Sequence, residues 1–595
     1  MFGRQLRPSR LLMRARRIIR NDQLILVVLA VVVGALAGIG TILIREGIDW
    51  VQTIGFGSPD ESIFSMASDL AWWVVLLVPT AGGLIVGLFI YWVMPEKKPQ
   101  SVAKVIEASA LRGGRMTIRE GFGAAVASVI SIGSGASVGR EGPAIHLGAT
   151  LGAWVARRLH LTRSLSRALL GCGAAAAVAA SFNAPIAGAL FAHEVVVGHF
   201  ALSAFAPIVI ASVVGTIFAR AYFGDFPAFS VFEQSLVSIW EFPAVIGLGV
   251  ASGITAIILM RSVMVAEDQF KKVPGPTWTH PAIAGFLVGL IALVFPQVLG
   301  VGYAATNDAM QTIIPLQFLI ALVFAKILAT ALSLGGGFGG GIFTPSLMVG
   351  AMLGGAYGIV ATSIFPDLSS GPGAYTIIGM GAVAAAVLGA PISTTLIVFE
   401  LTDNYPLTIA VMVAVVIATV MVQQFNGRSY FSWQLERAGL DLKGGFEAAL
   451  LRSIKVSKVM TKESETIPVS AGIAEIRHLL QESPTGELFV LKEDRELFGT
   501  ITLHDLHDIA FESDLDMDNL INAGDVARLH PPVIDLDDDL QTANKLIRDS
   551  GEHYIAVVDD HKSMKFQGTL HETEVMVAYN RALVEAREEE HQSGI

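Results

Sequence analysis

The apolar residues of this chain gather in long uninterrupted runs instead of alternating with polar residues. Residues 24–44 read LILVVLAVVVGALAGIGTILI, and residues 72–94 read WWVVLLVPTAGGLIVGLFIYWVM. Because a helix rises about 1.5 Å per residue, about 20 apolar residues cross a hydrocarbon layer of about 30 Å. Such runs recur until near residue 445. The pattern predicts an integral multi-pass membrane protein.

Composition agrees with this prediction and narrows the chemistry. Of the 595 residues, 53% are hydrophobic and 16% are charged, which is more apolar surface than a soluble core can bury. The net charge of −11 argues against nucleic acid as a partner. The single cysteine, Cys172, excludes an internal disulfide. No nucleophile–base set and no metal-ligand spacing stands out, so we expect neither an enzyme nor a resident metal or cofactor.

The chain changes character near residue 445. Residues 1–21 carry seven arginines, which by the positive-inside bias place the N-terminus in the cytoplasm. We expect the membrane to be the plasma (inner) membrane. Beyond residue 445, short strand-like stretches alternate with charged helical segments, which predicts a cytoplasmic α/β region. We predict four parts: a basic segment (1–21), a membrane domain (22–445), and two soluble halves (446–515 and 516–595), the second with an acidic tail. Two cytoplasmic ends require an even number of crossings.

An internal repeat organises the membrane part. Residues 171–194 (GCGAAAAVAASFNAPIAGALFAHE) resemble residues 379–400 (GMGAVAAAVLGAPISTTLIVFE), and a glycine-rich turn followed by proline precedes each copy, at 133–143 and 335–345. Repeats with glycine and proline breaks in corresponding places are typical of transporters whose broken helices meet at a midplane site. We therefore expect a pseudo-twofold core with its site at the breaks.

The first glycine-rich turn, GSGASVGREGP, places Arg140 and Glu141 between apolar runs. Helix N-termini present unpaired N–H groups and the positive end of a dipole, so a glycine-rich turn into a helix can bind an anion. Glu141 would then be a tethered anion, able to fill the site when ionised and to leave it when protonated. The alternative is an Arg140–Glu141 pair that only satisfies itself inside the bundle.

Four motifs together resemble the CLC family of chloride channels and chloride/proton exchangers: GREGP (139–143), GGGIFTP (339–345), FNAPIAGALFAHE (182–194) and ELTDNYPL (400–407). The resemblance implies an all-α membrane domain, a CLC-type inverted repeat of tilted and re-entrant helices, and a homodimer with one pore per subunit. It also implies a gate at Glu141. The implied anion-binding residues are Gly139, Arg140, Gly142 and the backbone amides of Ile342 and Phe343.

Three positions depart from the family pattern. Gln100 or Ser101 stands where the ion-coordinating serine of the first selectivity motif is expected, and the motif's glycines and proline are absent. The coordinating tyrosine of the family matches Phe431, with Tyr430 beside it. The acidic residue of the internal proton relay matches Val195, which carries no proton. We therefore predict a passive chloride channel gated by a protonatable glutamate, with a chloride/proton antiporter using another proton path as the alternative.

The soluble region also repeats, since residues 459–480 parallel residues 526–547. This region resembles a pair of CBS domains, which implies possible regulation by ATP, ADP or AMP. Thr502 and Asp505 match the nucleotide-binding positions in the first copy, and His571 and Glu574 match them less well in the second. The alternative is a purely structural module. A CBS-bearing metal-ion transporter remains the other class, although the apolar runs offer few carboxylates for a divalent cation.

Overall fold

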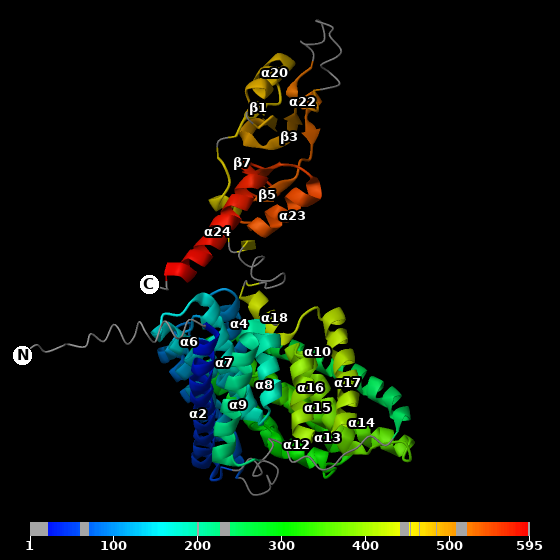
Figure 1. Ribbon diagram of the computed structural model, residues 1–595. Coiled ribbons are helices and arrows are strands. Elements are labelled where there is room, and N and C mark those ends of the chain that lie inside the picture. Colours follow the sequence, from blue (N-terminus) through cyan, green and yellow to red (C-terminus); the bar gives the residue numbers. More distant parts are fainter. Residues whose placement is uncertain are drawn as a thin grey trace, which may run out of the picture. The chain divides into compact units, whose positions relative to one another are not determined.

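The computed structural model describes residues 22–59, 71–198, 202–225 and 238–438, and most of 451–592 (Figure 1). The predicted basic segment 1–21 lies outside the described residues, as do residues 593–595 of the predicted acidic tail. The chain divides into two compact units, one up to Asp441 and one from Leu442.

The first unit is helical. Within the described residues, eight helices are long and apolar enough to cross a membrane. The helices of its first half are α2 (Asp22–Phe56), α3 (Trp72–Val93), α4 (Val102–Ala110), α5 (Ile118–Gly133), α6 (Glu141–Arg158), α7 (Arg163–Phe182), α8 (Pro185–Phe191), the π-helix η3 (Ala192–Val197) and α9 (Leu202–Phe223). Those of its second half are η4 (Ile239–Glu241), α10 (Phe242–Phe270), η5 (Thr277–Thr279), α11 (His280–Ala292), η6 (Pro296–Val298), α12 (Tyr303–Met310), α13 (Leu316–Gly335), α14 (Phe343–Ile364), α15 (Pro372–Leu388), α16 (Pro391–Thr402), α17 (Tyr405–Phe425) and α18 (Tyr430–Arg437).

The sequence repeat corresponds to two equivalent sets of three helices. Helices α6, α7 and α8 of the first half match α14, α15 and α16 of the second, and Figure 1 shows them in blue to cyan and in green to yellow. Pro143 and Pro345 occupy the same place in the first turn of α6 and α14. Asn183 and Gly389 end α7 and α15 with positive φ, of 60° and 70°. The helix breaks thus fall at the predicted glycine and proline positions.

Each copy of the repeat caps a helix of the other. Glu400, which closes the second copy, accepts hydrogen bonds from the backbone N–H groups of Ile186 (2.9 Å) and Ala187 (2.7 Å) at the start of α8. Glu194, which closes the first copy, accepts from the N–H groups of Ile392 (3.0 Å) and Ser393 (2.8 Å) at the start of α16. A carboxylate at a helix N-terminus satisfies orphan donors and complements the dipole. The two copies are therefore locked together reciprocally.

The second unit contains two similar α/β halves. The first has η7 (Val456–Lys458), β1 (Thr466–Pro468), α20 (Ile473–Glu482), β2 (Glu487–Leu491), η8 (Glu493–Arg495), β3 (Leu497–Thr502), α22 (Ala523–Val526) and β4 (Arg528–Leu529). The second has β5 (Val533–Asp535), α23 (Leu540–Ser550), β6 (Tyr554–Val558), β7 (Phe566–His571) and α24 (Glu572–Gln592). The sheet orders are β1-β2-β3-β4 and β5-β6-β7. In both sheets the first pair of strands is parallel and the second antiparallel.

The two halves pack against each other through a small apolar core. Phe489 of β2 stacks on Phe566 of β7, with ring centroids 5.1 Å apart. Leu497, Ala556 and Val558 complete this cluster. An antiparallel bridge between Thr461 and Thr569 adds backbone hydrogen bonds of 2.9 Å in both directions. The halves therefore form one body.

A cluster of charges also joins the halves. Arg528 lies 2.8 Å from Glu552 and 3.6 Å from Asp505. Glu487, at the start of β2, is buried beside this cluster. Its burial, together with the negative charge of Glu552, raises the pKa of the Glu487 carboxyl from its ordinary value of 4.5 to about 7, against the opposing charge of Arg528.

We expect Glu487→Gln to stabilise the second unit at neutral and alkaline pH. Because the folded pKa lies above the unfolded one, the stability contributed by protonated Glu487 is full below pH 4.5 and is lost as the pH rises through about 7. With allowance for solvent screening, the gain above that pH is about 1–2 kcal/mol. Thermal unfolding of the full chain across this pH range measures the effect. The exposed Glu493→Gln is the control, and equal pH slopes for both variants would contradict the assignment.

Candidate anion pathway

The two glycine-rich turns meet in space. Gly139 donates its N–H to the carbonyl of Gly341 at 2.7 Å, and Gly341 donates to the carbonyl of Gly139 at 2.8 Å. A Cβ on Gly340 would lie 2.3 Å from Cγ2 of Val138, so a side chain there does not fit. The N-termini of α6 and α14, which the sequence separates by about 200 residues, are thereby held side by side.

Side-chain hydroxyls reinforce this junction. Ser131 accepts a hydrogen bond from the N–H of Gly339 at 3.0 Å. The N–H of Ser137 donates to the hydroxyl of Ser333 at 3.1 Å, and the Ser137 hydroxyl lies 3.2 Å from that of Thr330. Each contact joins a residue of the first half of the membrane unit to one of the second half. Backbone groups freed by the helix breaks are thus satisfied inside the protein, as the membrane interior requires.

Glu141 begins α6 and is completely buried. Its Oε1 accepts a hydrogen bond from the hydroxyl of Tyr303 at 2.9 Å, and its Oε2 accepts from the hydroxyl of Thr344. Arg140 is farther away, with Nε 3.9 Å from Oε1, and its guanidinium lies over the Tyr303 ring at 4.9 Å. The hydrogen bonds to the carboxylate therefore come from the second half of the chain.

Neither Tyr303 nor Thr344 was among the site residues predicted from the sequence. Thr344 lies inside the GGGIFTP motif (339–345), so its place in the sequence could have indicated a role at the site. Tyr303 follows Gly302 in a segment, VLGVGY, that carries no local indication of a role. Only the fold brings its hydroxyl to Glu141.

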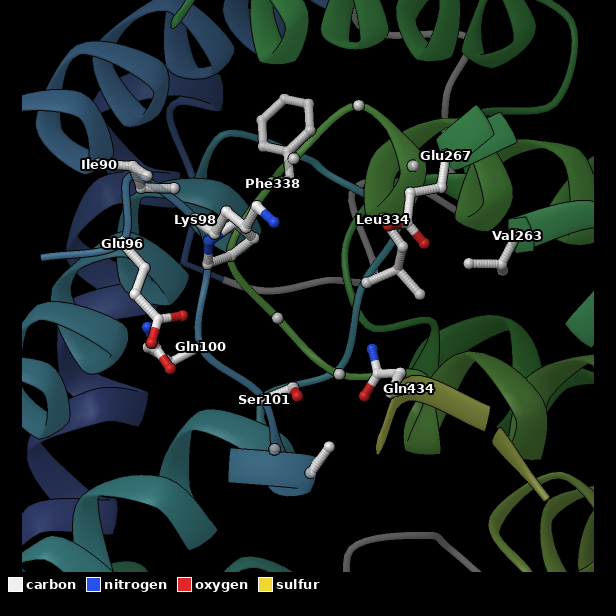
Figure 2. A pocket seen from close by; sticks show the side chains of 18 of the residues that line it. Ile90, Glu96, Lys98, Gln100, Ser101, Val263, Glu267, Leu334, Phe338 and Gln434 are labelled. Atoms are coloured by element: carbon white, nitrogen blue, oxygen red, sulfur yellow. The ribbon is translucent and has the colours of Figure 1, made fainter. Parts of the chain in front are cut away.

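A cavity of about 840 Å³ reaches this junction (Figure 2). Of the predicted anion-binding residues, those that line it are Gln100, Ser101, Gly142, Ile342, Phe343, Tyr430 and Phe431. Gly139 and Arg140 are not part of the lining and lie with Glu141 beside it. Helices α4, α6 and α14 all begin at this cavity, so three sets of N-terminal N–H groups surround it.

The residues that depart from the family's two anion-coordinating positions line the cavity. Ser101 is the N-cap of α4, and its side chain makes no capping hydrogen bond. Ser101 and Gln434 come from different segments, and both line the cavity (Figure 2). Gln434 donates to the hydroxyl of Tyr430 at 3.0 Å. Tyr430 and Phe431 are both buried, and both line the cavity. Phe431 has no hydroxyl to offer an anion, but the adjacent Tyr430 does.

The charged residues that line the cavity favour an anion. The lining includes five lysines and arginines, namely Lys97, Lys98, Lys104, Lys271 and Arg437, against three carboxylates, Glu96, Glu107 and Glu267. Lys104 lies 2.9 Å from Glu96 and 3.2 Å from Glu107. A surplus of positive charge in a cleft raises the local concentration of anions.

The position matched to the proton relay is apolar in its surroundings as well as in its side chain. Val195 lies in the π-helix η3 and packs against the main hydrophobic core. Its neighbour Glu194 caps α16, as described above. His193 is buried and stacks on Phe205, with ring centroids 5.5 Å apart.

In the second unit, the first predicted nucleotide-binding position is already paired. Asp505 accepts hydrogen bonds from the N–H and the hydroxyl of Thr502, both at 2.7 Å, and faces Arg528. At the second position, Glu574 accepts from the hydroxyl of Thr461 and from the N–H of His571 at 3.1 Å. A cavity of about 290 Å³ opens here, lined by Thr461, Ser464, Glu465, Thr485, Phe489, Tyr554, Thr569, His571 and Glu574.

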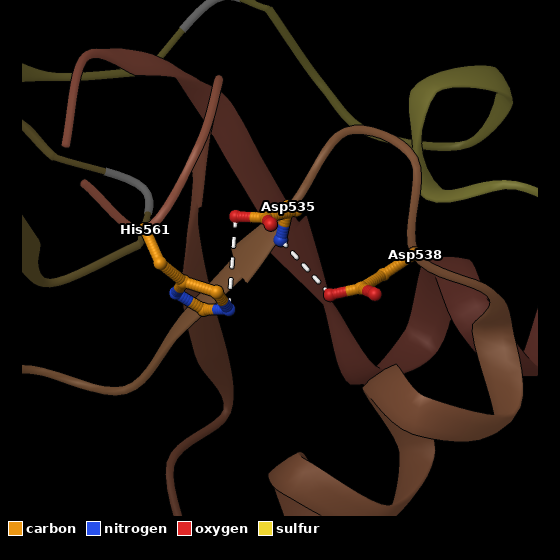
Figure 3. A group of neighbouring side chains, drawn as sticks. All are labelled: Asp535, Asp538 and His561. Atoms are coloured by element: carbon orange, nitrogen blue, oxygen red, sulfur yellow. Dashed lines mark hydrogen bonds and ion pairs between the residues drawn. The ribbon is translucent and has the colours of Figure 1, made fainter. Parts of the chain in front are cut away.

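Asp535, Asp538 and His561 form a further group in the second unit (Figure 3). Their possible ligand atoms lie within 4.8 Å of one another. Asp538 accepts from the backbone N–H of Asp535 at 3.1 Å, and His561 Nε2 lies 3.7 Å from Asp535 Oδ1. Asp535 and His561 are 28% and 58% exposed, but the Oδ1 atom of Asp535 is itself buried and accepts no hydrogen bond from the described residues.

Comparison with known proteins identifies both units. A family model for voltage gated chloride channels matches residues 82–423, and the CBS domain model matches residues 456–511 and 523–581. A putative chloride channel protein, ClcB-like, from Ralstonia nicotianae is 33% identical over 413 residues, which cover 69% of this chain and 96% of that protein. The chloride channel protein CLC-f of Arabidopsis thaliana is 28% identical over 542 residues, covering 81% and 69%.

Solved structures agree on the fold. A slow cyanobacterial Cl⁻/H⁺ antiporter aligns with a TM-score of 0.63 and 24% identity, covering 69% of this chain and 97% of that one. A eukaryotic CLC transporter aligns with a TM-score of 0.61 and 19% identity, covering 92% and 97%. The predicted fold class is confirmed, and the chain belongs to the CLC family of voltage-gated chloride channels and transporters, with a pair of CBS domains after the membrane unit.

Proposed function

We propose that this CLC protein is a passive chloride channel gated by Glu141. The observation that carries the proposal is the buried Glu141 carboxylate beside a cavity that is lined by three helix N-termini and by more cations than carboxylates. The ionised carboxylate occupies a place suited to an anion and excludes chloride. On protonation it loses its charge, and the hydrogen bonds that favour its position weaken, so chloride can pass.

Because the chain belongs to the CLC family, we no longer consider the alternative of a CBS-bearing metal-ion transporter. The choice between channel and antiporter depends on the proton path. Val195 has no titratable group, and Glu194 beside it is engaged with the start of α16. Both features favour passive conduction. The antiporter remains the alternative, and the reversal potential decides between them.

The further parts of the proposal concern assembly and placement. We include a homodimer with one pore per subunit in the inner or plasma membrane, with the N-terminus and the CBS pair in the cytoplasm. The anion-binding residues are those given above, including Gly139 and Arg140 beside the gate.

We also include adenine nucleotide as a regulator of the CBS pair. The cavity at Glu574 is favoured over Thr502 and Asp505, because Arg528 already pairs with Asp505. Its volume lies at the small end of the range for ligand pockets. Among the described residues that line it, Glu465 and Glu574 carry negative charge and none is lysine or arginine. AMP, with the fewest phosphates, is therefore the favoured ligand.

Glu141→Gln should open the pathway at all pH values. The amide resembles the protonated carboxyl and cannot compete as an anion. In reconstituted vesicles, wild-type chloride flux should rise up to about tenfold per unit of acidification while the carboxylate is mostly ionised, and the variant's flux should stay within about twofold. Equal pH dependence in both proteins would remove Glu141 from the gate.

The reversal potential in symmetric chloride should remain at zero when a pH gradient is applied. A channel moves chloride alone, so a proton gradient supplies no driving force. Planar-bilayer current recordings at a pH difference of about two units test this, because that gradient would supply an antiporter with about 3 kcal/mol per proton. A reversal potential that follows the gradient would establish the antiporter and a proton path that avoids Val195.

Adenine nucleotide should bind the detergent-solubilised full chain, and Glu574→Ala should weaken binding by about tenfold through loss of hydrogen bonds to a charged group. Asp505→Ala should have a smaller effect. Calorimetry with AMP, ADP and ATP measures both. A larger loss with Asp505→Ala would move the site to the first copy, and no heat with any nucleotide would leave a structural module.

A further inference from the structure

The Glu141 carboxylate is held from two sides by residues outside its own helix. Tyr303 begins α12 and donates to Oε1 at 2.9 Å. Thr344, in the first turn of α14, donates to Oε2. Each oxygen thus has its own hydroxyl donor, and both donors come from the second half of the chain. Hydrogen bonds to a charged acceptor favour the charged form.

We propose that Tyr303 and Thr344 form a latch that holds ionised Glu141 in the closed position and sets the pH at which the pathway opens. The inference rests on the proposed gating function of Glu141. Both hydroxyls contact the gating carboxylate itself. On protonation, the carboxyl becomes a weaker acceptor for both donors, so the latch releases the neutral side chain.

The surrounding backbone leaves room for this arrangement. A Cβ on Gly139 would lie 2.8 Å from Oε2 of Glu141 and 3.0 Å from the Thr344 hydroxyl. Gly302, with φ of 96°, turns the chain directly into Tyr303. Glycine is needed at 302 because other residues rarely adopt that conformation.

A buried lysine fixes the segment that carries Tyr303. Lys326 of α13 is fully buried, and its Nζ donates to the carbonyls of Val298 and Gly300, both at 3.0 Å. These carbonyls lie just before Gly302 and Tyr303. The tyrosine is therefore placed by a charge-assisted contact and does not depend on a free loop.

The charged and titratable groups around Glu141 come from three neighbouring elements. The turn before α6 supplies Arg140, α12 supplies Tyr303, and α13 supplies Lys326, which is turned toward the carbonyls. The α14 contact, Thr344, does not titrate, and His146 lies more than one turn farther along α6. The pH of opening therefore follows the Glu141 carboxyl, with Arg140 as a constant positive charge at 3.9 Å.

Tyr303→Phe and Thr344→Val test the latch, because each removes a hydroxyl and nearly preserves shape. Each should move the pH of half-maximal chloride flux upward by about one unit, since loss of one hydrogen bond to the carboxylate makes protonation easier. The double variant should move it further, and Thr344→Ser should restore the wild-type value. Tyr357→Phe, a tyrosine of α14 packed against Tyr375, is the matched control and should leave the profile unchanged.

A measurement that needs no transport separates the latch from the proposed function. Infrared spectroscopy follows the C=O stretch of the protonated Glu141 carboxyl, identified by its loss in Glu141→Gln. If this band titrates about one unit higher in Tyr303→Phe, the latch stands even if no chloride moves, and only the channel proposal fails. Unchanged titration in both single variants overturns the latch, as does a downward shift. A flux shift that persists in the Glu141→Gln background also overturns it.

Discussion

The exchange of two backbone hydrogen bonds between Gly139 and Gly341 is the constraint on which the pathway depends. It joins the broken helices of the two repeat copies at the point where both leave N–H groups unpaired. Such an approach requires backbones without side chains between them, and the clash predicted for a Cβ at Gly340 shows how little space remains. Because the membrane interior provides no water to satisfy free backbone groups, the junction must satisfy them itself. The groups that remain unpaired can then face an anion.

The buried gate follows from the same junction. A carboxylate is costly to bury unless hydrogen bonds or charges compensate for the lost water. Glu141 obtains this compensation from Tyr303 and Thr344, which the junction and the Lys326 contacts bring to it. The carboxylate is therefore stable where it stands, and a change of protonation removes much of that stability. A group whose position depends on its charge is suited to act as a gate.

Glu194 and Glu400 make reciprocal helix caps, which neither copy of the repeat could make by itself. Each carboxylate satisfies the first N–H groups of a helix in the other copy. The CBS halves have diverged instead. Arg528 pairs with Asp505 in the first, whereas a cavity lies beside Glu574 in the second. Equivalent backbones thus carry different chemistry where the side chains differ.

The sequence by itself determined the membrane character, the repeat, the helix breaks and Glu141 as a buried acid. These features follow from local rules. Runs of apolar residues need lipid or a protein core around them, and glycine and proline interrupt helices. A charged residue between apolar segments is costly in a membrane and therefore indicates a function. The match to the family pattern also pointed to seven residues of the cavity lining, namely Gln100, Ser101, Gly142, Ile342, Phe343, Tyr430 and Phe431. Tertiary structure alone decided what holds Glu141, since Tyr303 and Thr344 lie 162 and 203 residues away along the chain. It also decided that a cavity lies beside Glu574, and that Arg528 faces Asp505, since strand pairing brings these two residues together. Hydrogen bonds between distant residues leave no periodicity or spacing in the sequence, and they form only after packing has fixed both partners.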